Sequence, residues 1–196
     1  MATRRYESPA REEAAAAARS RVIDAAIALA YERGNIDMTL DQIASRAGTT
    51  VRTILRQFGS RDDLIEAAIE VASIEVAEER RDPGGDADRS IALLVEHYER
   101  RGRFVLQILA LDQPGPRRVA ASGRLLHRAW VEEAFGSRLP AAAARRTELV
   151  DLLVVATDVY AWKLLRLDRE LDATTTEARI LLMTQLLLGS ATPREA

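Results

Sequence analysis

The sequence predicts an all-α protein with an N-terminal three-helix domain that contains a helix-turn-helix, followed by a larger C-terminal helical domain. Apolar residues recur at three-to-four spacing along most of the 196-residue chain. No segment alternates with the period of a strand, and no internal repeat is present. Pro- and Gly-rich breakers at 81–88 and 112–116 separate the periodic segments, which places helices between them.

The chain begins with a polar stretch and a short helix. Residues 1–18 include Pro9, and we expect them to form a flexible arm ahead of a domain over residues 19–66. The first helix is predicted from Ser20 to Arg33, and Gly34 is expected to end it. Its apolar face is Val22, Ile23, Ala26, Ile27 and Ala30. Arg19 and Arg21 lie at the start of this helix, where they either approach a phosphate or remain solvated.

Two short helices follow, separated by Gly48. Thr39 is a predicted N-cap for the first, and Gly48 supplies the left-handed residue that turns the chain. In the second, one arc is apolar: Val51, Ile54, Leu55 and Phe58. The other arc is polar and doubly basic: Thr50, Arg52, Thr53, Arg56 and Gln57. This arrangement is typical of a helix-turn-helix.

The segment RVIDAAIALAYERGNIDMTLDQIASRAGTTVRTILRQFGSRDDLIEAAI resembles the DNA-binding domain of the TetR family of one-component bacterial repressors. The resemblance covers about a quarter of the chain. It differs at Leu55, where a tyrosine that touches phosphate is common, at Val51, where a basic residue is frequent, and at Arg52, where a small residue is usual. The helical pattern places Leu55 at the buried edge, and Arg52 and Arg56 are expected to compensate from the outward arc.

The resemblance implies a DNA-binding transcriptional regulator, released from a palindromic operator by a small-molecule effector. We expect Arg52 and Arg56 on guanine edges or phosphates, with a solvated side chain or an internal ion pair as the alternative for each arginine. Gln57 is assigned to adenine and Thr53 to a thymine methyl group. Thr39 and Arg61, at helix starts, are assigned to phosphates. The full set expected on DNA is Thr39, Thr50, Val51, Arg52, Thr53, Arg56, Gln57 and Arg61.

The basic residues that could attract nucleic acid are concentrated in one part of the chain. The formal net charge is −2, so attraction to nucleic acid must be local. From Thr39 to Arg61 there are four arginines against one acid, a local balance of +3. The absence of cysteine excludes disulfides and thiolate metal sites. With neither a signal peptide nor a membrane anchor recognisable, we expect a cytoplasmic, nucleoid-associated protein.

Ser60 is a predicted N-cap for a fourth helix that ends near Arg80, and the breaker 81–88 leads into the remaining helices. The first is predicted over 90–101 and is followed by a short apolar piece over 104–111, and the next helix runs from about residue 117 to 136. The resemblance assigns residues 67–196 to effector binding and dimerisation.

Two long C-terminal helices are predicted over 141–167 and 174–189. Both are apolar on almost every side, so they need a partner surface beyond their own domain. We therefore expect a homodimer built as an intersubunit four-helix bundle. Asp151, Asp158 and Lys163 interrupt the apolar run, which excludes a membrane span.

An effector pocket is expected among polar and aromatic residues on these apolar helices. The residues are His97, Tyr98, Phe104, Gln107, His127, Trp130, Tyr160 and Trp162. No cofactor and no metal are expected, and an enzyme is disfavoured because no phosphate loop or metal-ligand motif is present. Asp151 and Asp158, two turns apart on one helix, are the nearest approach to a carboxylate pair. The other alternative is a helical protein-interaction adaptor that has lost DNA binding.

Overall fold

The computed structural model describes residues 9–190, and every regular element in that range is helical. This confirms the all-α prediction. The chain divides into two compact units, an N-terminal unit (Met1–Ala72) and a C-terminal unit (Ser73–Ala196). The sequence-based boundary between residues 66 and 67 falls within one helix, α4 (Arg61–Arg80), which begins in the N-terminal unit and ends in the C-terminal unit.

The N-terminal unit contains α1 (Pro9–Arg33), α2 (Leu40–Ala47), α3 (Val51–Phe58) and the first turns of α4. The start expected for the first helix, Ser20, was wrong, because α1 begins at Pro9. Proline suits the first helical position, and the alanines that follow have high helix propensity. Residues 10–18 of the expected arm are therefore helical, and residues 1–8 lie outside the described part.

Short-range capping defines α2 as predicted. Thr39 caps α2 in a reciprocal pair: its hydroxyl accepts from the Gln42 amide at 3.3 Å, and the Gln42 side chain accepts from the Thr39 amide at 3.0 Å. Gly48 has φ +64° and ends α2, which confirms its turning role. Fully or nearly fully buried residues from all four helices form the core of this unit: Val22, Ala26, Ile43, Ile54 and Leu64.

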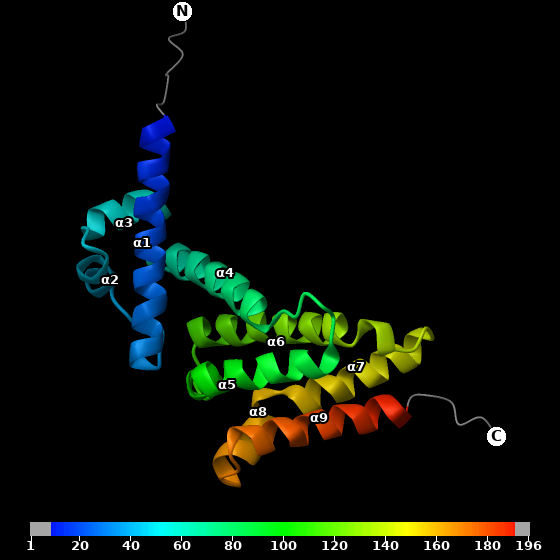
Figure 1. Cartoon of the computed structure of the whole chain (residues 1–196). Coiled ribbons are helices and arrows are strands. Elements are labelled where there is room, and N and C mark those ends of the chain that lie inside the picture. The colour runs from blue at the N-terminus through cyan, green and yellow to red at the C-terminus, as the bar shows by residue number, and fades with distance from the viewer. Residues whose placement is uncertain (1–8, 191–196) are drawn as a thin grey trace, which may run out of the picture. The chain divides into compact units, whose positions relative to one another are not determined.

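The C-terminal unit is built from helices that pack side by side (Figure 1). They are α5 (Ala87–Leu109), α6 (Pro114–Ala134), α7 (Ala143–Thr157), α8 (Val159–Lys163) and α9 (Ala173–Ser190). A 3₁₀ turn (Gly136–Arg138) follows α6, and a π-helical turn (Leu164–Asp168) follows α8. The core is apolar and draws on all of α5–α9, with Ile91, Leu94, Val131, Leu153, Trp162 and Ile180 almost completely buried.

Two predictions for this unit were wrong, one about the continuity of a helix and one about where a helix begins. The segments 90–101 and 104–111 are one helix, α5, in which Gly102 is buried. The indole of Trp162 packs where a side chain at residue 102 would lie, which explains a glycine at a mid-helix position. The expected start of the next helix, near residue 117, was also late, because Pro114 opens α6.

The helix predicted over 141–167 is also interrupted. Asp158 has an extended backbone, and its carboxylate accepts from the Tyr160 amide at 2.8 Å, so it caps α8 and ends α7. The break frees the Thr157 carbonyl, which accepts a hydrogen bond from the buried Tyr98 hydroxyl at 3.0 Å.

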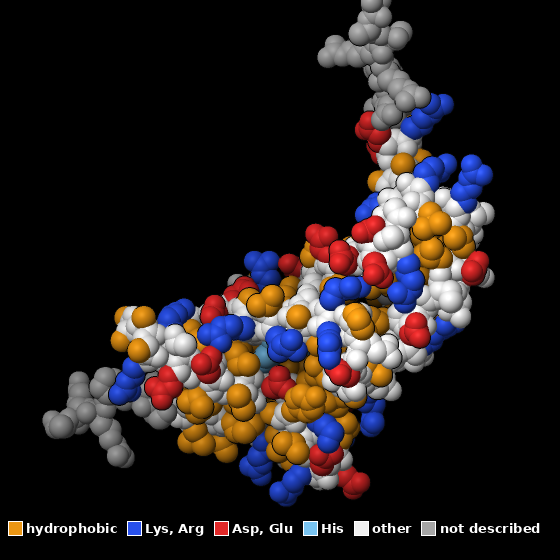
Figure 2. Space-filling model, turned by 180° about the vertical axis from the view of Figure 1, so that it is seen from behind, with side chains coloured by type: hydrophobic (Ala, Val, Ile, Leu, Met, Phe, Trp, Pro, Cys, Tyr) orange, Lys and Arg blue, Asp and Glu red, His pale blue; other side chains and the backbone are white. Residues whose placement is uncertain are grey.

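Large apolar side chains remain exposed on the C-terminal unit. Those on α7, α8, α9 and the π-helical turn are Leu152, Val155, Tyr160, Leu164, Leu182 and Leu186. Hydrophobic side chains gather along the lower part of this unit in Figure 2. Leu182 and Leu186 are four residues apart, so they lie on the same side of α9. We call these six residues the C-terminal apolar face.

Candidate functional site

The short helix α3 presents a polar surface from a firmly packed base. Ile54 is completely buried and Phe58 nearly so, whereas Arg52 and Arg56 are exposed. Thr50 caps the helix, since its hydroxyl accepts from the Thr53 amide at 3.2 Å and lies 3.0 Å from the Thr53 hydroxyl. Thr53 is partly buried, so the two arginines stand out furthest from the helix.

Leu55 does not lie where the sequence pattern placed it. Its side chain is 41% exposed, so the expectation of a buried edge was wrong. At about 100° per residue, Leu55 is about 80° from the centre of the face that Ile54 and Phe58 bury, which turns it toward Arg52. The surface of α3 therefore combines one apolar side chain with two cations.

The C-terminal end of α3 is held by Arg19 from α1. Its Nη1 donates to the Gln57 carbonyl at 3.0 Å, and its guanidinium lies 4.0 Å from the centre of the Phe58 ring. A cation at the carbonyl end of a helix is favourable both as a hydrogen-bond donor and for the helix dipole. Arg19 thus fixes the orientation of α3, a role that neither sequence-based alternative included.

Arg61 is also used inside the N-terminal unit. Its Nε donates to the Met38 carbonyl at 2.8 Å and its Nη2 to the Ile36 carbonyl at 3.0 Å. It lies within ion-pair distance of Asp37, at 3.9 Å. These bonds hold the loop that leads into the Thr39 cap, so the structure gives Arg61 a positioning role. Its assignment to a phosphate stays a prediction.

Arg46 and Arg33 are likewise engaged. Arg46 forms two hydrogen bonds with the Glu32 carboxylate, and this contact lowers the pKa of that carboxyl group. Arg33 donates to the Gln42 side chain at 2.7 Å. In contrast, Arg52 and Arg56 have no ion pair with any residue in the described part of the chain. The surface of α3 therefore carries two cations available for an external anion.

Comparison with known proteins identifies the helix-turn-helix domain. Residues 22–68 match the family model described as "Bacterial regulatory proteins, tetR family". This segment includes α2 and α3 and the packing residues below them. Residues 22–68 therefore resemble the DNA-binding domain of TetR-family regulators. This match assigns the helix-turn-helix of the N-terminal unit to DNA binding.

Solved structures show the same fold along almost the whole chain. A TetR-family transcriptional regulator from Streptomyces coelicolor is 18% identical with a TM-score of 0.64, covering 92% of this chain and 91% of that one. A transcriptional regulator from Rhodococcus sp. Rha1 is 16% identical with a TM-score of 0.62, covering 88% and 96%. A complex of SmeT with triclosan is 17% identical with a TM-score of 0.60, covering 89% and 91%. No curated protein sequence matches the chain significantly.

The residues expected to line an effector pocket differ in how deeply the structure buries them. Five are buried: His97, Tyr98, His127, Trp130 and Trp162. Phe104 is partly buried, whereas Gln107 and Tyr160 are exposed, and Tyr160 belongs to the C-terminal apolar face. His127 stacks on Trp130 with a centroid separation of 5.6 Å, and His97 lies 5.7 Å from Tyr98. The pocket itself stays a prediction, with these two ring pairs as its centre.

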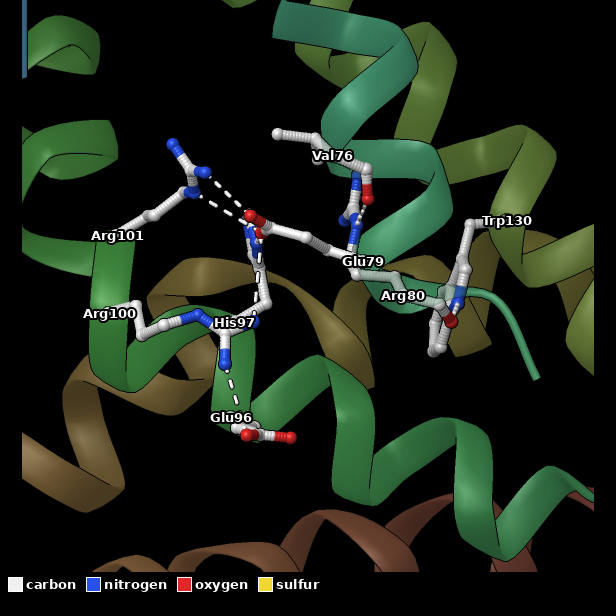
Figure 3. Close-up of polar contacts among 8 residues, drawn as sticks. All are labelled: Val76, Glu79, Arg80, Glu96, His97, Arg100, Arg101 and Trp130. Carbon is white, nitrogen blue, oxygen red and sulfur yellow. Dashed lines mark hydrogen bonds and ion pairs between the residues drawn. The ribbon is translucent and has the colours of Figure 1, made fainter. Parts of the chain in front are cut away.

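Glu79 organises one side of this region (Figure 3). Its carboxylate accepts hydrogen bonds from Arg101 and lies 3.0 Å from His97 Nδ1. Burial opposes ionisation of Glu79, but the Arg101 and His97 contacts outweigh burial and lower the pKa of Glu79 to about 2. Burial and the nearby charge of Arg80 lower the pKa of His97 to about 4. Arg101 and His97 are four residues apart on α5, but Glu79 lies on α4, so the local pattern did not predict that Glu79 joins them.

Asp151 and Asp158 do not form a carboxylate pair. Asp151 accepts from Arg128 at 2.7 Å, and Asp158 caps α8 after the helix break. Within residues 9–190, no cluster of three or more ligating side chains is arranged to hold a metal ion. In the same range, no helix combines the length and hydrophobicity that crossing a membrane would require.

Proposed function

We propose that this TetR-family regulator is a homodimeric repressor that binds a palindromic operator through α3 and leaves it when a small effector binds the C-terminal unit. The observation that carries the DNA-binding part is the pair of exposed, unpaired arginines on α3, Arg52 and Arg56. A helix of this kind enters the major groove with its polar face toward the base edges.

The contacts divide by role. We assign Arg52 and Arg56 to guanine edges or phosphates, and Thr50, Thr53 and Gln57 to the bases and backbone beside them. Val51 and the exposed Leu55 are suited to apolar contact with thymine methyl groups. Thr39 is assigned to a phosphate at the start of α2. Arg19 acts through the protein, because its guanidinium group holds the end of α3. Arg61 holds the loop before α2 and is also assigned to a phosphate.

The C-terminal apolar face supports the dimer. Six large apolar side chains on neighbouring helices are exposed in the single chain, a pattern that marks interaction surfaces. Two copies related by a two-fold axis would bury this face and present two α3 helices to successive major grooves.

Release by an effector requires that the effector bind the DNA-incompetent arrangement more tightly, typically by ~1–3 kcal/mol. SmeT, whose fold is similar, has been solved in complex with triclosan, which supports a ligand-binding role for the C-terminal unit here. The helix α4 runs unbroken from the end of the helix-turn-helix to Arg80, so it is the covalent route between the two units.

The test replaces both α3 arginines. Wild-type protein and the double variant Arg52→Ala, Arg56→Ala are compared on an operator isolated from random DNA by the wild-type protein. Each guanine contact is worth ~1–3 kcal/mol, so we expect affinity to fall at least about 30-fold, with dimerisation unchanged. Arg46→Ala is the matched control, because Arg46 is already paired with Glu32. Equal affinity of wild type and double variant would overturn the assignment of this face.

A further inference from the structure

Arg80, the last residue of α4, is a buried cation without a counter-ion. Arg80 is only 4% exposed to solvent. Its Nε donates to the Val76 carbonyl of its own helix at 3.4 Å, and no carboxylate of the described residues lies within ion-pair distance. Figure 3 shows the side chain folded back beside α4 rather than extended toward Glu96 or Glu79. The terminal guanidinium nitrogens are thus without a carboxylate partner.

The adjacent carboxylate does not relieve this charge. Glu79 is engaged by Arg101 and His97, with Arg100 3.7 Å away. Burying a cation costs several kcal/mol unless a counter-ion or hydrogen bonds compensate. Arginine stays protonated in proteins even when burial lowers its pKa, so deprotonation does not solve the problem for Arg80.

A second unpartnered polar atom belongs to the same region. The Thr157 hydroxyl donates to the Leu153 carbonyl at 2.7 Å, so it accepts from His127 Nε2 at 3.1 Å. His127 therefore carries its proton on Nε2, and its buried Nδ1 is an acceptor with no hydrogen-bond partner. Buried polar atoms are normally hydrogen-bonded, so an unpaired acceptor near an unpaired cation indicates a place for a ligand.

Trp130 connects the two groups. Its ring stacks on His127, and its Nε1 donates to the Arg80 carbonyl at 3.1 Å. The charge of Arg80 lowers the pKa of both His97 and His127, which agrees with a guanidinium that faces these rings. Apolar core residues, including Trp130 and Phe135, lie against the same region.

We propose that the C-terminal unit binds a small, largely apolar molecule bearing a carboxylate, and that Arg80 is the residue that pairs with that carboxylate. His127 Nδ1 accepts a hydrogen bond from a donor on the same molecule. This inference rests on the proposed function, because it names the chemical class of the effector. Since Arg80 ends α4, a ligand that moves Arg80 moves the end of the helix that follows the DNA-binding motif.

The test measures thermal unfolding with four probes: benzoate and octanoate, and their neutral amides benzamide and octanamide. We expect at least one carboxylate to raise the Tm saturably, by about 3 °C or more at ten times its Kd, and its amide to raise it far less. The proposal is overturned if, at about 10 mM, neither carboxylate raises the Tm more than its amide does. That concentration is high enough to detect binding with a Kd of about 1 mM.

Variants locate the effect. Arg80→Met should abolish the carboxylate-dependent shift, whereas Arg80→Lys, which keeps the charge, should retain part of it. Arg100→Met is the matched control: it removes an exposed arginine that is also close to Glu79, and the shift should survive. A shift that persists in Arg80→Met, or is lost equally in Arg100→Met, would place the anion elsewhere. If Arg80→Met does not fold, loss of the shift in Arg100→Met or its absence in Arg80→Lys overturns the assignment.

Operator binding is measured separately on the wild-type protein with the same probes. Operator binding without any carboxylate effect on Tm overturns the Arg80 site and leaves the DNA-binding function standing. Carboxylate binding that leaves operator affinity unchanged overturns the effector role. The two failures are therefore distinguishable.

Discussion

At the scale of single residues, Gly102 shows how one missing side chain permits tight packing. A Cβ built at this position would lie 2.6 Å from Cζ3 and 2.8 Å from Cη2 of Trp162, which is itself only 2% exposed. The indole cannot move without disturbing the core, because its Nε1 is held by Glu99 at 2.9 Å.

Gly102→Ala is therefore expected to destabilise the C-terminal unit by about 1–3 kcal/mol through overpacking, although alanine has the higher helix propensity. Urea unfolding followed by circular dichroism measures the change. Gly123→Ala in α6 is the control, since a Cβ there meets nothing within 4 Å, and it should gain up to about 1 kcal/mol. A stabilised Gly102→Ala would contradict the packing of Trp162.

The buried histidines predict a pH dependence. Burial, with the charge of Arg80, lowers the pKa of His127 to about 4 from an ordinary value of 6.5. Between these values the unfolded chain binds the proton and the folded chain does not, so stability falls as pH falls from 6.5 to about 4. The slope is about 1.4 kcal/mol per pH unit for each such histidine.

His127→Gln removes that proton while its amide can still donate to Thr157. Its free energy of unfolding should vary less over pH 6.5–4 than that of the wild type, by up to about 3 kcal/mol across the window. Chemical denaturation at several pH values measures this. Identical pH slopes for the two proteins would show that His127 titrates normally in the folded state.

Residue roles were predictable where they depend on near neighbours in the chain. Thr39, Gly34 and Gly48 follow from capping and turn rules, and the latter two have positive φ. Arg80 was not recognised, although it lies four residues after the partly buried Val76, because an arginine at a helix end is usually solvated. Its burial depends on helices α5 and α6, which the local pattern does not place.

At the scale of elements, the break between α7 and α8 depends on Asp158. Its carboxylate caps α8 through the Tyr160 amide. We predict that Asp158→Ala lowers the free energy of unfolding by about 1 kcal/mol, the usual contribution of an N-cap. Asp151→Ala, which removes an exposed pair with Arg128, should change it by less than about 0.5 kcal/mol. Urea unfolding measures both changes, and an equal loss of stability in the two variants would contradict the capping role of Asp158.

Helix existence was more predictable than helix continuity. Apolar spacing identified part of each α-helix, but it missed the alanine-rich first turns of α1, joined α7 to α8 and divided α5 at Gly102. In both of the last two places the continuity of the helix is linked to a contact with a distant helix. The Tyr98 hydroxyl donates a hydrogen bond to the Thr157 carbonyl at the break, and Trp162 occupies the space beside Gly102. Likewise, Leu55 was misplaced because a helix of eight residues leaves its edge positions undecided until its neighbours are known.

At the scale of the whole molecule, the C-terminal apolar face predicts how two copies associate. Val155 is 69% exposed on α7 and Leu186 is 65% exposed on α9. A glutamate at either position would bury a charge in the proposed dimer, so Val155→Glu and Leu186→Glu should each yield monomers. Leu125→Glu, at a residue 73% exposed on α6, is the control and should stay dimeric. Sedimentation equilibrium distinguishes the two masses, and a monomeric wild type would contradict the proposed face.

The most direct test of the proposed function is selection of binding sites from random-sequence duplex DNA, followed by a salt titration on the enriched site. A dimer that reads DNA through two α3 helices should enrich a palindrome with half-sites about one helical turn apart or a multiple of that. The logarithm of its affinity should fall linearly with the logarithm of salt concentration, at about −0.9 for each phosphate neutralised. Enrichment of a single asymmetric site, or of no sequence at low salt, would contradict the proposal.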